Sequence, residues 1–111
     1  MDPLSLRNLV EEASLEAAET FVRNYTDLLP QRVERIVLSV GIGDRAMAMD
    51  AALSLGTSSS MAGALRINRL CRDLQQALIA ADMASAAAAA REITLHLPDL
   101  REALAGPPPT P

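Results

Sequence analysis

The stretch of sequence that decides the fold is residues 15–40, LEAAETFVRNYTDLLPQRVERIVLSV. Its apolar side chains recur every three or four residues over about seven helical turns: Leu15, Ala18, Val22, Tyr25, Leu29, Val33, Ile36 and Val40. This spacing puts them on one side of an α-helix, which must be buried against other elements. Pro30 interrupts the pattern. Because it has no amide hydrogen to donate to residue 26, we expect it to kink the helix or split it locally.

The segments on either side of this stretch also have helical signals. Asp2 followed by Pro3 is typical of a helix start and predicts a short helix that ends near residue 13. After residue 40, two glycines end the long helix, and Asp44 is the predicted N-cap of the next one, over residues 44–60.

Two more helices follow in the C-terminal half. Residues 64–80 form the first, and Asp82 is the predicted N-cap of the second, which continues to about residue 104. Pro98 is expected to bend that last helix near its end. Residues 106–111 are GPPPTP, which cannot continue a helix and are expected to form a disordered tail.

The resulting fold class is all-α. Long amphipathic helices with short connections pack as antiparallel neighbours, so we expect an up-down-up-down four-helix bundle with the short N-terminal helix packed across it as a cap. At 111 residues the chain supports one domain, over residues 1–105, followed by the tail.

Composition excludes several function classes. The net charge is −4 and all ten basic residues are arginine, so a basic face for nucleic acid is not expected. Arg66, Arg69 and Arg72 do share a helical side, which we interpret as a solvated face. The single cysteine, Cys71, cannot form an internal disulfide and is interpreted as a small, half-buried apolar residue. No apolar run is long enough for a membrane span or a secretion signal, which favours a cytoplasmic location.

The predicted helix over residues 44–60 has two unlike faces. At 100° per residue one face gathers small side chains around Leu55 and is the side we expect to be buried: Ala48, Ala51, Ala52, Leu55, Ser59 and Ala62. The opposite, outward stripe is also apolar or small and is bordered by a single charge, Asp50: Ala46, Met49, Leu53, Gly56, Thr57 and Ser60. Solvent faces usually hold charged residues, so this stripe is interpreted as a contact surface. The alternative is that the first helix or the tail folds over it as a second core layer.

Two motifs in this region resemble those of histidine phosphotransfer (HPt) domains. That family has a Gly-Asp helix start, then Ala-His-x-Leu-Lys-Gly-Ser-Ser, and after a short gap Gly-Ala-x-x-Leu-x-x-Leu-Cys-x-x-Leu-Glu. This chain has Gly43-Asp44, then ALSLGTSS at residues 52–59 and GALRINRLCRDLQ at residues 63–75. The two motifs agree in register, and the resemblance covers residues 4–104. It implies an HPt-like bundle and a place in two-component phosphorelay signalling.

The chain departs from the family pattern at the residues that carry out phosphotransfer. The phosphoacceptor histidine of the family matches Leu53, its neighbouring lysine matches Gly56, and its following glycine matches Thr57. Leucine has no lone pair with which to attack a phosphoryl group. The resemblance therefore implies a chain with no catalytic residue at this position, which we expect not to be an enzyme and to need no cofactor.

No other residue is expected to replace the missing histidine. His96 is the only histidine and is interpreted as a boundary residue of the last helix, rather than a phosphoacceptor or a metal ligand, and no metal site is predicted. Ser58, Ser59 and Ser60 are interpreted as small hydroxyls closing a helix against its neighbour, because no base is positioned to activate them.

The resemblance implies that docking survives where phosphotransfer is lost. HPt domains present an apolar patch around the histidine to the receiver domain of a response regulator. We expect a pseudo-phosphotransfer protein that binds a receiver domain, or a histidine kinase, through Ala46, Met49, Asp50, Leu53, Gly56, Thr57 and Ser60. No nucleic-acid or membrane partner is expected. A monomer is favoured, and the alternative is a self-associating or scaffolding bundle with Leu53 and Met49 at a homodimer interface.

Overall fold

The computed structural model describes the backbone of residues 3–105 and the side chains of residues 11–105. This part of the chain holds four helices and no strand: α1 (Pro3–Gly41), α2 (Arg45–Met61), α3 (Leu65–Ile79) and α4 (Met83–Ala105). The prediction of an all-helical fold with a four-helix bundle is confirmed for these residues. The expected disordered tail, residues 106–111, lies outside the described residues.

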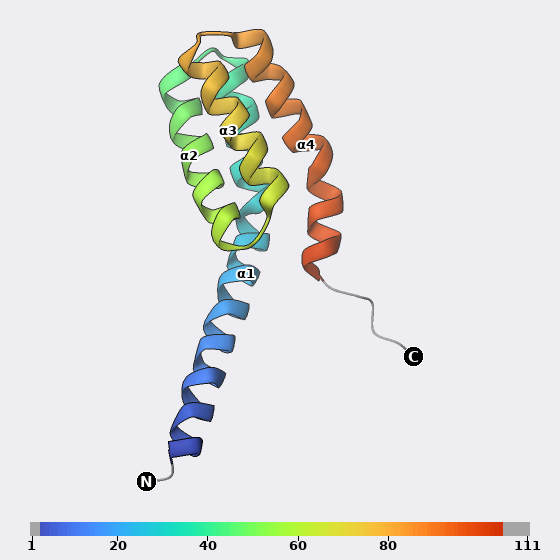
Figure 1. Cartoon of the computed structure of the whole chain (residues 1–111). Coiled ribbons are helices and arrows are strands. Elements are labelled where there is room, and N and C mark those ends of the chain that lie inside the picture. Colours follow the sequence, from blue (N-terminus) through green and yellow to red (C-terminus); the bar gives the residue numbers. More distant parts are fainter. Residues whose placement is uncertain (1–2, 106–111) are drawn as a thin grey trace.

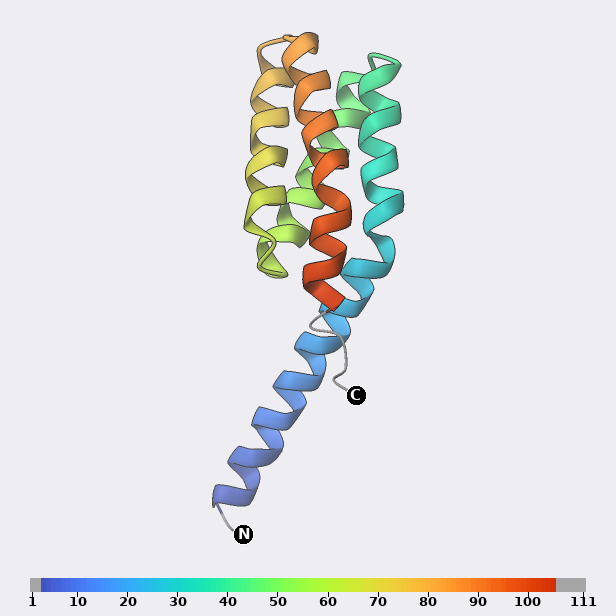
Figure 2. The ribbon, with the colours of Figure 1, turned by 90° about the vertical axis from the view of Figure 1, so that its right-hand side faces the viewer.

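The helices form a ring in which each contacts two others. α1 packs against α2 and α4, α3 packs against the same two, and the backbones of the diagonal pairs among the described helices stay apart. The chain reverses direction at each of its three connections (Figures 1 and 2). The centre of the ring is filled by aliphatic side chains from all four helices, each fully buried: Leu29, Ile36, Leu55, Ile67, Leu74 and Ile93.

The prediction of a short N-terminal capping helix is wrong. Residues 3–13 are instead the beginning of α1, which is continuous over 39 residues. It extends well past the ends of the other helices, away from the bundle (Figure 1). The physical reason is that the Ala13-Ser14-Leu15 sequence contains no glycine or proline to end a helix. α1 also continues through Pro30 without splitting, and Figure 2 shows that it changes direction where it enters the bundle.

Short turns with defined caps connect the helices, as the sequence predicts. Gly43 has a φ of +74°, a left-handed conformation that glycine adopts without strain. The next residue, Asp44, is the N-cap of α2 and accepts a hydrogen bond from the amide of Met47 at 3.0 Å. Before α4, Asp82 accepts hydrogen bonds from the hydroxyl and the amide of Ser85, and these hold the pKa of its carboxyl below the usual value.

One buried hydrogen bond ties α1 to the C-terminal half of α2. The hydroxyls of Tyr25 and Ser59 lie 2.7 Å apart, and both residues are buried. Burial raises the pKa of the Tyr25 phenol. Beside this pair, the guanidinium of Arg32 donates to the hydroxyl of Ser58 at 2.6 Å. These contacts fit the interpretation that Ser58 and Ser59 close α2 against a neighbouring helix. None of the described helices is long and apolar enough to cross a membrane.

Candidate functional site

The outward side of α2 is the candidate site, and the structure leaves its central residue open. Leu53 is 50% exposed. The alternative that the N-terminal segment covers this stripe is wrong. The N-terminal part of α1 extends away from α2, and its residues 11–20 are themselves exposed. Four other predicted site residues are exposed as expected: Ala46, Asp50, Thr57 and Ser60.

Two predicted site residues are placed differently by the structure. Gly56 is buried, and Met49 is half-buried and packs against the core. Both lie at the edge of α2 that faces α3, so the close packing of these helices widens the buried face beyond what a helical projection indicates. A Cβ atom on Gly56 would lie 3.3 Å from the Cβ of Cys71. Gly56 is therefore a close-approach residue between α2 and α3 and not an exposed position of the stripe.

Substituting Gly56 should therefore cost stability. We expect Gly56→Val to lower the free energy of unfolding by about 1–3 kcal/mol, because the added methyl groups overpack the α2–α3 contact. Thr57→Val is the matched control, since it places the same side chain on the adjacent, exposed position. Urea denaturation of the two variants measures the difference, and equal stabilities would contradict the packing role of Gly56.

A shallow groove of about 350 Å³ lies between α2 and α3 beside Leu53. One wall is the outward edge of α2, and the other is formed by polar side chains of α3: Asn68, Arg72 and Gln75. The amide of Asn68 donates to the carbonyl oxygen of Gly56 at 2.8 Å, which joins the two walls. The α3 wall was missed at the level of sequence. The sequence feature that could have revealed this wall is the polar side of α3 that carries Arg72.

The far edge of the stripe is bordered by an ion pair with α1. A guanidinium nitrogen of Arg35 lies 2.8 Å from a carboxylate oxygen of Asp50, and both side chains are largely exposed. Exposed pairs of this kind contribute little to stability. The pair does set a polar limit to the stripe, so the apolar side chain of Leu53 lies between this charged edge and the α3 wall.

The groups around Leu53 can bind but are poorly suited to covalent chemistry. Hydroxyl, amide and guanidinium groups line the groove, and no nucleophile with a neighbouring base is present among its residues. Cys71 lies beneath it, fully buried where the sequence predicted a half-buried residue, and burial raises the pKa of its thiol to about 12. The thiol therefore stays protonated at neutral pH. No cluster of metal-binding side chains occurs within the described residues.

His96 lies away from the groove beside Leu53. It is half-buried on α4, whose backbone does not come close to that of α2 in the described bundle. The histidine and the groove therefore lie on different sides of the ring. The interpretation of His96 as a boundary residue agrees with its partial burial.

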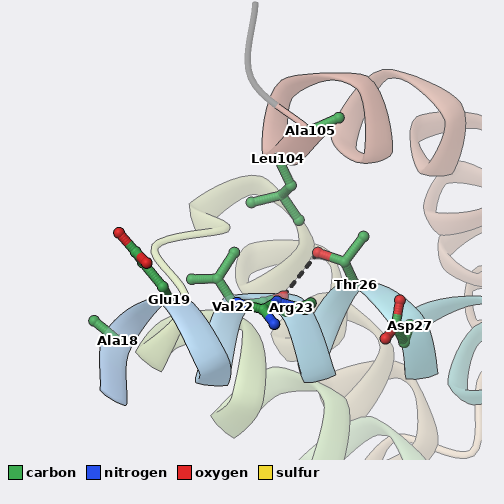
Figure 3. A pocket seen from close by; sticks show the side chains of 8 residues that line it. All are labelled: Ala18, Glu19, Val22, Arg23, Thr26, Asp27, Leu104 and Ala105. Carbon is green, nitrogen blue, oxygen red and sulfur yellow. Dashed lines mark hydrogen bonds between the residues drawn. The ribbon is translucent and has the colours of Figure 1, made fainter. Parts of the chain in front are cut away.

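A second hollow, of about 550 Å³, lies between α1 and the C-terminal end of α4, at the end of the bundle away from the α1–α2 turn. Figure 3 shows Leu104 at the end of α4 pointing toward α1, near Val22 and Thr26. Beyond this level α1 has no further helix beside it (Figure 1). The hollow therefore marks where α4 ends over α1 and contains none of the predicted site residues.

Comparison of the chain with protein-family models, with curated proteins and with solved structures finds no match. The resemblance of residues 43–75 to HPt domains therefore stays a prediction, and the function is argued from the α2 surface itself.

Proposed function

We propose that this chain is a non-catalytic pseudo-phosphotransfer protein of two-component signalling. It binds the receiver domain of a response regulator, or a histidine kinase, through the outward side of α2 without accepting phosphate. The proposal includes an HPt-like up-down-up-down bundle and a cytoplasmic location.

The observation that carries the proposal is the exposure of Leu53. This residue occupies the position of the family's phosphoacceptor histidine, and half of its surface is open to solvent. A leucine there presents apolar surface to a partner, yet offers no atom that can accept a phosphoryl group. The neighbouring groove adds hydrogen-bonding groups from α3 at the rim, which is the usual arrangement of an interface: an apolar centre with a polar border.

The test is a screen of the purified chain against the receiver domains encoded by the same organism. We expect at least one receiver domain to bind with a Kd in the micromolar range. In the same tubes, labelled phosphate on the receiver should not pass to the chain. Absence of binding to every receiver at high micromolar concentration, or an acid-labile and base-stable label on the chain, would contradict the proposal. A histidine-containing phosphotransfer protein of the same organism is the positive control for the transfer step.

A further inference from the structure

The N-terminal part of α1 extends beyond the bundle, and among the described residues only the end of α4 comes near it, beside Val22. We call residues 3–22 the arm; every residue from 11 to 20 is exposed, and Leu15 is 63% exposed. The arm continues the apolar stripe of α1, so residues that the sequence predicted to be buried, Leu15 and Ala18, remain uncovered. Most of the stability of a helix in a protein comes from packing of its apolar side, which this part of α1 lacks within the described residues. A binding partner would therefore stabilise the arm.

Charge is divided unequally between the arm and the rest of the chain. Residues 1–28 hold six acidic side chains and two arginines, whereas residues 29–111 hold eight of each. The whole net charge of −4 thus belongs to the N-terminal quarter. Within the arm, Glu12, Glu16 and Glu19 recur at intervals of four and three, which places them on one side of the helix beside Leu15.

The outer face of α3 has the complementary pattern. Arg66, Arg69 and Arg72 are exposed there, and the helix begins at Leu65 and ends at Ile79, which are 71% and 76% exposed. α3 packs on α2 and α4 through its other sides. Among the described side chains the one ion pair joins Arg35 to Asp50, so the arm glutamates and the α3 arginines have no partner among those side chains.

The two surfaces also match in length. At a rise of 1.5 Å per residue the glutamates extend over about 10 Å of the arm and the arginines over about 9 Å of α3. The arm as a whole is about 30 Å long by the same rise, enough to cover the roughly 22 Å of α3. Pairing of two arms with each other would instead bring like charges together, which is unfavourable.

We propose that the partner of the arm is a second copy of this chain, with the arm of each copy lying along the outer face of α3 of the other. The arm glutamates face the α3 arginines, and Leu15 lies near the exposed Leu65 at the start of α3. Because the same two copies exchange arms, the contact is two-fold symmetric and closes as a dimer. This surface does not include Leu53, although Arg72 also lines the groove beside it; Arg66 and Arg69 lie outside that groove.

Sedimentation velocity of the full chain and of charge-exchanged variants tests this proposal. The wild type should sediment with twice the mass of one chain at micromolar concentration and dissociate as salt is raised. Glu12→Arg with Glu16→Arg should give a monomer, and so should Arg66→Glu with Arg69→Glu. Combining all four substitutions should restore the dimer, and this rescue shows that the monomeric variants did not merely misfold.

Three results would overturn the proposal. The first is a wild type that stays monomeric. The second is a dimer that survives the α3 substitutions, which would indicate pairing of the arms with each other. The third is dissociation of the dimer by Leu53→Arg, which would place the interface on α2 instead. None of these measurements involves a receiver domain, so they succeed or fail separately from the proposed function.

Discussion

We expect Leu53→Arg to abolish binding of the proposed receiver domain and to leave the helical content of the chain unchanged. The substitution places a charge at the centre of the proposed interface, where docking would remove it from water without a partner. Substitutions at central interface residues lose about 2–4 kcal/mol of binding free energy, which corresponds to a Kd raised by about 30- to 1,000-fold. Arginine is a good helix former and residue 53 is half exposed, so the fold has little reason to change.

Leu95→Arg is the matched control for this measurement. Leu95 is 64% exposed and lies on α4, which does not contact α2, so the same substitution adds the same charge away from the proposed interface. Titration calorimetry with one receiver domain, together with circular dichroism, compares the variants. An equal loss of affinity in both would indicate a general charge effect, and unchanged affinity in Leu53→Arg would show that Leu53 is not in the interface.

Leu55→Ala should cost far more stability than the same substitution two residues earlier. Leu55 is completely buried in the ring of helices, whereas Leu53 is half exposed on the same helix. Truncating a buried leucine loses transfer free energy and leaves a cavity, for about 2–5 kcal/mol in total. This is a large share of the 5–15 kcal/mol that stabilises a typical domain.

Leu53→Ala controls for helix propensity, because it makes an identical change in the same helix. We expect it to alter the free energy of unfolding by no more than about 0.5 kcal/mol, as is usual for surface positions. Urea denaturation followed by circular dichroism gives both values. If the two variants were equally unstable, Leu53 would be covered in solution, and the case for an open docking surface would be lost.

The sequence predicted the helices and their connections well because both depend on local signals. The side chain of Asp44 caps α2, and the side chain of Asp82 accepts a hydrogen bond from Ser85 at the start of α4. Both contacts join residues three positions apart, so the local sequence is enough to predict them. The buried face of α2 was also predicted at Ala48, Ala51, Ala52, Leu55 and Ser59, since a helical period fixes which residues share a side. The prediction of a short capping helix failed, because a helix start signal at residue 2 does not indicate where that helix ends.

The candidate site was predicted in part. Leu53, Thr57 and Ser60 are exposed as the helical projection indicates, but Gly56 is not. A glycine has no side chain whose polarity could reveal its environment, and its burial follows from how closely α3 approaches. The groove wall from Asn68 to Gln75 was missed for the same reason, because it exists only where two helices lie side by side.

The sequence by itself therefore determined the all-helical class, the caps and the side of each helix that can be buried. It also determined that residue 53 is a leucine, whose side chain has no atom that can accept a phosphoryl group. These follow from residue chemistry and from the 3.6-residue period, which act within a few residues of each position. Only the tertiary structure decided how much of each apolar stripe is covered. Val33 and Leu15 belong to one stripe of α1, yet Val33 is buried and Leu15 is exposed, because the other helices end before they reach the arm.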